Sequence, residues 1–355
     1  MAYRIIQELP SAEEVRERFP IGADHRVEEH RQEIRNILTG EDRRLIAVVG
    51  PCSSWPSEAV YKYADRAARL AEEIRTRVLP VMRLYIQKPR TTLGWPGPLT
   101  QPDPLAPADI QKGIWQCREM MWRVGQQHPL ADEMLFTNNE GYFVDGLSYI
   151  AIGARSTADQ EHRFIASGLF ETDDDCPVGI KNPVDGDIAV GVDGVECAQH
   201  PHTFAWRRHT VETQGNPYAH LILRGGKGGS NYDPASLALA AKQLKSPKRE
   251  IRNPAVLIDA SHDNCQNGNG KDPILQAHVV HTVLGAMERG HDGYEVVKGF
   301  MLESFLKNGR QNIGPDMDMD GLSITDPCLG WEDTERLLRE TADAVDRIMG
   351  KASGV

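Results

Sequence analysis

The sequence lacks the features that mark membrane, secreted and nucleic-acid-binding proteins. None of its apolar runs approaches the ~18 residues that a membrane-spanning helix needs. Its first residues mix both charge signs and contain no apolar segment of the kind found in secretory signals. Basic residues are in the minority, since 40 lysines and arginines face 51 aspartates and glutamates, for a net charge of −11. Because phosphate contacts need a basic surface, we expect a cytoplasmic protein without membrane or nucleic-acid partners.

Cysteine is scarce and shows no pattern. The six cysteines are scattered without CxxC or zinc-finger spacing, which predicts reduced thiols rather than a disulfide framework. There is also no internal repeat and no low-complexity tract. A chain of 355 residues can bury a large core without disulfides or a structural metal. This length fits two domains of about 150 residues each, or one α/β barrel of about 250 residues with extensions.

Short apolar runs recur after residue 44, and each is closed by a polar or glycine-containing turn. Most are continuous rather than alternating, as expected of parallel strands that are buried on both faces. The eight predicted strands are Leu45–Val49, Val78–Tyr85, Met134–Phe136, Tyr149–Gly153, Val178–Lys181, His220–Arg224, Ala255–Asp259 and Gly299–Leu302. Apolar residues at helical spacing predict helices between the first two runs and over 272–289 and 332–349.

Eight strands with intervening helices predict an α/β fold of the (β/α)8 TIM-barrel type. We assign the barrel to residues 44–355 and treat residues 1–43 as an N-terminal extension. The segment 183–219 is longer than a simple connection needs. Its apolar and aromatic stretch, His202–Trp206, predicts an inserted hairpin.

Six cations occur within or just after the predicted strands, where TIM barrels carry their active sites. They are Arg83, Lys88, Arg90, Arg155, Lys181 and Arg224. Any one of them has a simple explanation as a structural ion pair. Converging on one barrel mouth, however, uncompensated cations would repel one another and resist desolvation. The set therefore indicates multiply anionic ligands, because arginine binds phosphate and carboxylate through two parallel hydrogen bonds.

A second group of side chains suits a metal ion. Its members are Cys52, His262, Glu303 and Asp326. A thiolate, an imidazole and two carboxylates can bind a divalent transition metal, which would polarise a carbonyl oxygen. Each residue alone is more often a buried thiol, a hydrogen-bonded core histidine, a cap or a surface acid, so the metal interpretation rests on their joint placement. The pattern alone leaves both interpretations open, and it leaves open a Schiff base on Lys181, as in class I aldolases.

Several longer stretches resemble the type I 3-deoxy-D-arabino-heptulosonate 7-phosphate (DAHP) synthases. They are VVGPCS (48–53), VMRLYIQKPRTTLGW (81–95), IGARSTADQEHRFIASGL (152–169), PVGIKNPVDG (177–186), HLILRGGK (220–227), LIDASHDN (257–264), MLES (301–304) and SITDPCLGWEDT (323–334). The resemblance covers about residues 44–349, in order and with family-like spacing. It implies a transferase that condenses phosphoenolpyruvate with erythrose 4-phosphate to DAHP and phosphate. This reaction is the first step of the shikimate pathway to the aromatic amino acids.

The resemblance also implies a role for each site residue. The implied metal ligands are Cys52, His262, Glu303 and Asp326, with Mn²⁺ favoured and Fe²⁺, Co²⁺ or Zn²⁺ as alternatives. The implied phosphoenolpyruvate site is Arg83, Arg155, Lys181, Arg224 and the backbone of Ala154. The implied aldose site is Lys88, Pro89, Arg90 and Thr91. Lys88, Glu133 and His262 are the implied catalytic residues, with Lys88 acting on the aldehyde oxygen and Glu133 steering the attacking water. Lys181 then binds an anion, which disfavours the Schiff base.

The surroundings of these motifs depart from the family pattern. Gln87, Pro96 and Phe305 stand where the family usually has Glu, Lys and His. The segments 134–136 and 138–141 and the loop Asn264–Gly270 also differ from the family. Two alternatives follow: the same chemistry on another phosphorylated or amino aldose in a specialised pathway, or an inactive regulatory paralogue. The retained ligand set argues against the second. The resemblance further implies a homodimer or homotetramer, with the extension 1–43 serving in assembly or regulation.

Overall fold

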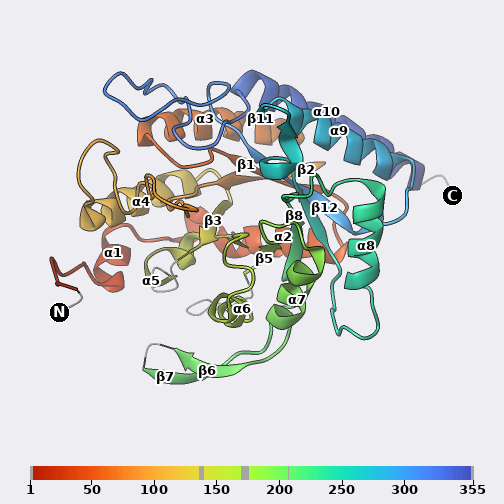
Figure 1. Ribbon diagram of the computed structural model, residues 1–355, viewed down its shortest axis with the longest axis horizontal. Helices are drawn as coiled ribbons and strands as arrows, with labels where there is room; N and C mark the ends of the chain where they lie inside the picture. Colours follow the sequence, from red (N-terminus) through yellow and green to blue (C-terminus); the bar gives the residue numbers. More distant parts are fainter. Residues whose placement is uncertain (1–2, 136–139, 169–175, 207, 353–355) are drawn as a thin grey trace.

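The predicted barrel is present in the computed structural model, which describes residues 3–135, 140–168, 176–206 and 208–352 (Figure 1). Eight parallel strands close into a barrel in the order β1-β12-β9-β8-β5-β4-β3-β2. Their bounds are β1 Leu45–Gly50, β2 Val78–Arg83, β3 Leu130–Met134, β4 Tyr149–Ile152, β5 Val178–Lys181, β8 His220–Leu223, β9 Val256–Asp259 and β12 Val297–Glu303. The (β/α)8 architecture is thereby confirmed.

Helices surround the strands on the outside. They are α3 Ser57–Ile74, α4 Ile110–Gly125, α5 Glu140–Phe143, α6 Gln160–Ala166, α7 Ile188–Gln199, α8 Pro234–Leu244, α9 Leu275–Glu288 and α10 Trp331–Ala352. Four of them begin after an aspartate whose side chain accepts a backbone N–H of the first turn, which satisfies a donor that the helix itself leaves free. These caps are Asp109, Asp159, Asp187 and Asp233. The helices predicted over 272–289 and 332–349 correspond to α9 and α10.

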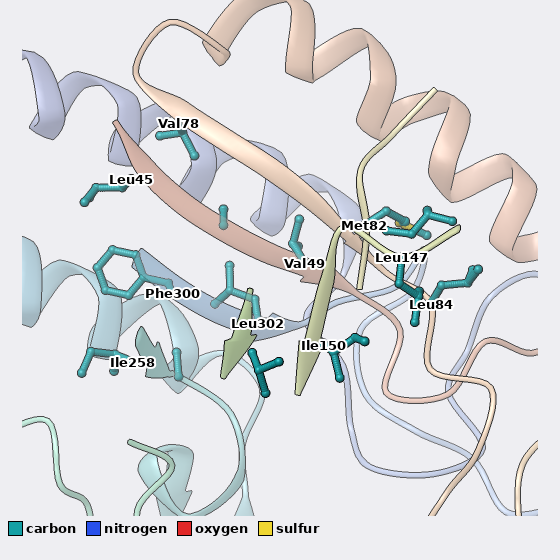
Figure 2. Packing of buried hydrophobic residues seen from close by; sticks show 14 of the residues in the cluster. Leu45, Val49, Val78, Met82, Leu84, Leu147, Ile150, Ile258, Phe300 and Leu302 are labelled. Carbon is teal, nitrogen blue, oxygen red and sulfur yellow. The ribbon is translucent and has the colours of Figure 1, made fainter. Parts of the chain in front are cut away.

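The core has an outer and an inner layer because successive side chains of a strand point to opposite faces. In β1, Leu45 and Val49 belong to the outer cluster between strands and helices, where Phe300 and Leu302 of β12 join them (Figure 2). The alternate residues Ile46 and Val48 belong to a second cluster inside the barrel. Burial on both faces is the reason that these strands are continuous apolar runs.

The extension closes one end of the barrel. It contains α1 Ala12–Arg18 and α2 Val27–Thr39. Three apolar residues of α2, Ile34, Ile37 and Leu38, join the inner cluster. The buried guanidinium of Arg31 donates to the carbonyl oxygens of Leu147 (2.8 Å) and Val144 (3.0 Å), which precede β4. Because α2 fills the amino end of the barrel, a ligand cavity inside it can open only at the carboxyl end.

The third strand was predicted wrongly. It is Leu130–Met134 rather than Met134–Phe136, so Glu133 lies within the strand and not before it. Asp132 and Glu133 interrupt the apolar pattern, although Asp132 is buried and Glu133 lines a cavity. The predicted end of this strand, Phe136, lies outside the described residues, as do positions 138 and 139 of the divergent segment.

Two hairpins are added to the barrel in the part of the chain that the structure describes. The predicted one is confirmed: β6 Thr203–Trp206 pairs antiparallel with β7 His209–Glu212 and projects away from the barrel (Figure 1). The second was not predicted and consists of β10 Gln266–Asn267 and β11 Gly270–Lys271, just before α9. Within the described ranges, no helix combines the length and apolarity needed to cross a membrane.

Candidate active site

A cavity of about 280 Å³ opens at the carboxyl ends of the barrel strands. All six predicted cations line it: Arg83, Lys88, Arg90, Arg155, Lys181 and Arg224. The predicted residues Pro89, Thr91, Glu133, Ala154, His262 and Asp326 line it as well. The lining also includes Lys271, which was not predicted. Residues far apart in the sequence thus meet at one place, because parallel strands bring their carboxyl ends to the same end of the barrel.

Three of the four predicted metal ligands form a compact group beside this cavity. One ligand atom each from Cys52, Glu303 and Asp326 lies within 4.8 Å of the other two. Cys52 follows β1 and Glu303 ends β12, two neighbouring strands paired at Gly50 and Glu303. The backbone N–H of Asp326 donates to Cys52 Sγ at 3.4 Å, which ties the loop before α10 to the group.

His262, the fourth predicted ligand, lies beside this group rather than within it. Its Nε2 is 3.7 Å from Glu303 Oε1. Its Nδ1 faces Asp259 Oδ2 at 2.8 Å, so Nε2 is the nitrogen turned towards the carboxylate of Glu303. Burial lowers the pKa of His262 to about 4, although Asp259 favours the charged form. The imidazole is therefore neutral near pH 7, which is the form that binds metals.

The protonation states of the other groups fit a divalent cation. Burial opposes ionisation of Glu303, but His262 in its protonated form and the charges of Lys88 and Arg83 outweigh it and hold its pKa below the usual value. Burial is likewise outweighed at Asp326, where Lys88 and Lys271 keep the pKa low. Two ionised carboxylates, a neutral imidazole and a thiol are a donor set for a transition metal.

The Cys52 side chain is fully buried and contacts Lys88. Lys88 Nζ lies 2.7 Å from Cys52 Sγ. Burial and the carboxylate of Glu303 raise the pKa of Cys52 to about 11, while Lys88 acts in the opposite direction. The thiol is therefore protonated at neutral pH, and binding of a metal through sulfur would release its proton.

Carboxylates compensate several of the cavity's cations. Arg83 Nη2 contacts Glu303 Oε1 at 2.9 Å, with both side chains 1 % exposed. Arg224 Nη1 contacts Asp263 Oδ2 at 2.5 Å. Arg155 Nη2 instead donates to Thr91 Oγ1 at 2.7 Å, which joins the two predicted substrate subsites. Ion pairs of this kind allow a cluster of cations to be buried before a ligand arrives.

Sequence reasoning missed Asp259, which joins two of the predicted functions. One oxygen of this fully buried carboxylate, Oδ2, contacts both Lys181 Nζ at 2.9 Å and His262 Nδ1 at 2.8 Å. Its other oxygen accepts from the backbone N–H and the hydroxyl of Ser261. Asp259 ends a correctly predicted strand, so the rule that strand ends carry the chemistry was a signal that could have found it.

Gly153 and Gln276 were also missed, and each supports a predicted acid. A Cβ on Gly153 would lie 1.8 Å from Glu133 Oε1, so the absent side chain is what makes room for this carboxylate. The side-chain amide of Gln276 pairs with the backbone N–H and C=O of Glu303, at 2.9 Å each. Gly153 ends the predicted strand Tyr149–Gly153, so its position was a signal, but the contacts of both residues are with groups distant in the chain.

The residues that depart from the family pattern surround the cavity. Gln87 is buried just before Lys88, and Phe305 is buried in the outer core with its ring 6.1 Å from that of Tyr63. The carbonyl oxygen of Pro96 accepts the backbone N–H of Lys88 at 2.9 Å. Among the described residues, none of these three belongs to the cavity lining. These three departures therefore affect the support of the lining rather than its chemical groups.

Comparisons with known proteins agree with this geometry. The sequence profile of the DAHP synthetase I family matches residues 18–339. The chain is 39% identical over 354 residues to a phospho-2-dehydro-3-deoxyheptonate aldolase of Corynebacterium glutamicum, covering 95% of this chain and 92% of the relative. It is 38% identical over 339 residues to the phenylalanine-inhibited enzyme of that name from Saccharomyces cerevisiae, covering 92% and 88%.

A solved structure gives the same result. The phospho-2-dehydro-3-deoxyheptonate aldolase of Francisella tularensis superposes with a TM-score of 0.89 at 33% identity, covering 98% of this chain and 99% of the other. The agreement extends over nearly the whole length of both chains, so it includes the barrel and the N-terminal helices. On these grounds the chain belongs to the DAHP synthetase I family.

Proposed function

We propose that the chain condenses phosphoenolpyruvate with erythrose 4-phosphate to DAHP and inorganic phosphate, the reaction that opens the shikimate pathway. The observation that carries this proposal is the cavity, in which six predicted cations and Lys271 surround a space beside a thiol–carboxylate group. Both substrates carry a phosphate, and phosphoenolpyruvate also carries a carboxylate. A site with this excess of positive groups suits two anionic substrates bound together.

The phosphoenolpyruvate subsite consists of Arg83, Arg155, Lys181 and Arg224, with the backbone N–H of Ala154. These groups come from the ends of four strands or the turns that follow them: β2, β4, β5 and β8, of which the last three are consecutive in the barrel. Lys181 is 3% exposed and contacts Asp259 at 2.9 Å, so it is fixed as a point charge. A lysine side chain held by a buried carboxylate suits the binding of an anion rather than the role of a Schiff-base nucleophile.

The aldose subsite consists of Lys88, Pro89, Arg90 and Thr91, which follow β2. Arg90 and Thr91 are exposed at the mouth of the cavity, whereas Lys88 reaches inward to Cys52. This arrangement suits an aldose whose phosphate remains at the mouth while its aldehyde reaches the interior. The Lys88 ammonium is then placed to donate to the aldehyde oxygen.

Cys52, His262, Glu303 and Asp326 would hold a divalent metal, with Mn²⁺ as the first choice and Fe²⁺, Co²⁺ or Zn²⁺ as alternatives. When bound, the ion would supply Lewis acidity next to the aldehyde subsite. The methylene carbon of phosphoenolpyruvate forms the new bond to the aldehyde carbon, whose oxygen takes a proton from Lys88. Glu133 orients a water and accepts its proton as the water adds to the enol carbon. Cleavage of the carbon–oxygen bond to phosphate then leaves the ketone.

The test measures phosphate release from phosphoenolpyruvate with purified protein and a panel of aldoses. Erythrose 4-phosphate is expected to give the highest kcat/KM, and a chelator should abolish the activity until Mn²⁺ is added back. Glu133→Gln should lower kcat about 100-fold or more, as expected for a general base. A higher kcat/KM with another phosphorylated or amino aldose would establish the alternative substrate. No phosphate release with any aldose would overturn the proposed activity.

We further propose that the protein is a cytoplasmic homodimer or homotetramer assembled through the extension 1–43. Its first described residues expose large apolar side chains, with Tyr3, Ile5 and Ile6 at 78%, 82% and 84%. Apolar surface of this kind is usual where another chain covers it. All six cysteines are free thiols, as suits a reducing compartment. Light scattering after size-exclusion chromatography should show the oligomer in the full chain and a smaller species after deletion of residues 1–10. An unchanged mass would refute the role of this segment.

A further inference from the structure

Lys271 enters the cavity from a hairpin outside the barrel strands. The strands β10 and β11 pair Gln266 with Lys271 and Asn267 with Gly270, so the chain reverses at 268–269. The base of the hairpin is tied by a hydrogen bond from Asp272 N–H to the Cys265 carbonyl at 2.9 Å. Lys271 is thus fixed between the short 3-10 helix that begins at His262 and the start of α9. The hairpin contains most of the glycine- and asparagine-rich loop Asn264–Gly270, which departs from the family pattern, and Lys271 follows this loop directly.

The Lys271 ammonium contacts a predicted metal ligand. Its Nζ lies 2.7 Å from Asp326 Oδ2, and the two side chains are 26% and 31% exposed. Among the described residues, Lys271 is the one side chain that donates a hydrogen bond to the Asp326 carboxylate. Asp326 belongs to the long loop between β12 and α10 and not to a strand. Lys271 therefore restrains the orientation of this carboxylate beside Cys52 and Glu303.

We propose that Lys271 is a positioning residue of the metal centre, which limits Asp326 to one ligand oxygen. An unrestrained carboxylate can bind a cation through both oxygens and so occupy two coordination positions. With Oδ2 engaged by the Lys271 ammonium, binding of the ion through both oxygens is disfavoured, which would keep a coordination position open, as catalytic metal sites require. This inference rests on the proposed function, because it assumes that Cys52, Glu303 and Asp326 bind the ion.

Replacing Lys271 with methionine keeps the length of the side chain but removes its charge and its hydrogen bond. The freed carboxylate should then chelate the ion, and the loss of a neighbouring cation removes a repulsion. We therefore expect Lys271→Met to bind Co²⁺ about tenfold more tightly, which is opposite in direction to the loss of about 10–100-fold that usually follows when the partner of a metal ligand is removed. The kcat should fall because the open position is lost, while the KM for phosphoenolpyruvate should change little. A merely structural role would instead weaken metal binding.

The experiment titrates metal-free protein with Co²⁺ and records its spectrum without substrates. The thiolate-to-cobalt charge-transfer band should appear in the unaltered protein and in Lys271→Met. The visible d–d bands should be weaker in the variant, because their intensity falls as the coordination number rises. Lys271→Arg, which keeps charge and donor, should retain the d–d intensity and the Co²⁺ affinity of the unaltered protein. Lys248→Met provides the matched control, because Lys248 is an exposed lysine in the connection before β9, at the opposite end of the barrel.

Two results would overturn the proposal in different ways. If Lys271→Met shows the charge-transfer band with unchanged d–d intensity, and its affinity for Co²⁺ is equal or weaker, Lys271 does not position Asp326 and the metal centre stands without it. If the unaltered protein shows no charge-transfer band, Cys52 is not a ligand. The proposed metal centre then fails, and the role of Lys271 fails with it. Thermal unfolding of each variant verifies that the barrel is intact.

Discussion

Replacing Gly153 with alanine should slow turnover roughly 100-fold while leaving substrate binding nearly unchanged. The added Cβ would lie 1.8 Å from Glu133 Oε1 and 2.8 Å from its Cδ, whereas ordinary contact begins at 3.4 Å. The carboxylate oxygen must therefore move by at least 3.4 − 1.8 = 1.6 Å. A misplacement of about 1 Å can cost about 100-fold in rate, or about 2.7 kcal/mol in the barrier. Because the clash involves the end of a flexible side chain, the fold should tolerate it.

The assay follows phosphate release at saturating erythrose 4-phosphate and varied phosphoenolpyruvate. The expected result is a fall in kcat with a KM for phosphoenolpyruvate within about threefold of the original, since Glu133 is proposed to orient water and not to bind this substrate. Gly314→Ala is the matched control, because a Cβ there meets nothing within 4 Å. Its kcat should be unchanged.

A second variant tests the cause of the loss. In Gly153→Ala combined with Glu133→Asp, the shorter acid avoids the new methyl group, so the double variant should be no slower than Glu133→Asp alone. Such non-additivity is the mark of two residues that act through one contact. If Gly153→Ala retains its kcat within twofold, the position of the Glu133 carboxylate does not matter and the proposed role of Glu133 is wrong.

Three further predictions concern the thiol, the buried acid and pH. Cys52→Ala should abolish both Mn²⁺-dependent turnover and the cobalt charge-transfer band with little loss of stability, and full activity in this variant would refute a thiolate ligand. Asp259→Asn should weaken Co²⁺ binding about tenfold and raise the KM for phosphoenolpyruvate about tenfold, because one Asp259 oxygen contacts both His262 and Lys181. A change in only the Co²⁺ affinity or only the KM would contradict this shared role. Burial lowers the pKa of His220 from 6.5 to about 4, so the folded state favours the neutral ring. The stability that this preference contributes is complete above pH 6.5 and is lost as the pH falls towards 4. The loss amounts to about 3 kcal/mol, at about 1.4 kcal/mol per tenfold change in proton affinity. Denaturant unfolding at several pH values should therefore show a shallower acid decline in His220→Asn, and an identical slope would count against this assignment.

The barrel was predictable because its physical cause is local. A strand that is buried on both faces must be apolar throughout, and this leaves runs such as Leu45–Val49 and Val178–Lys181 that can be found without any tertiary information. The same rule failed at β3, where Asp132 and Glu133 break the run. A charged residue inside a barrel strand contradicts the pattern unless a cavity is known to receive it. Functional residues are therefore where sequence patterns are least reliable.

What the sequence determined by itself is the closed sheet, the end of it that carries the chemistry, and the charged groups that gather there. The contacts that organise those groups depended on the tertiary structure. Asp326 meets Cys52 across 274 positions and Lys271 across 55, and Asp259 is shared between Lys181 and His262. Strand and helix periodicities arise from neighbours along the chain, whereas the direction of a buried side chain depends on which distant groups fold against it. The partners of the site residues were therefore visible only in three dimensions.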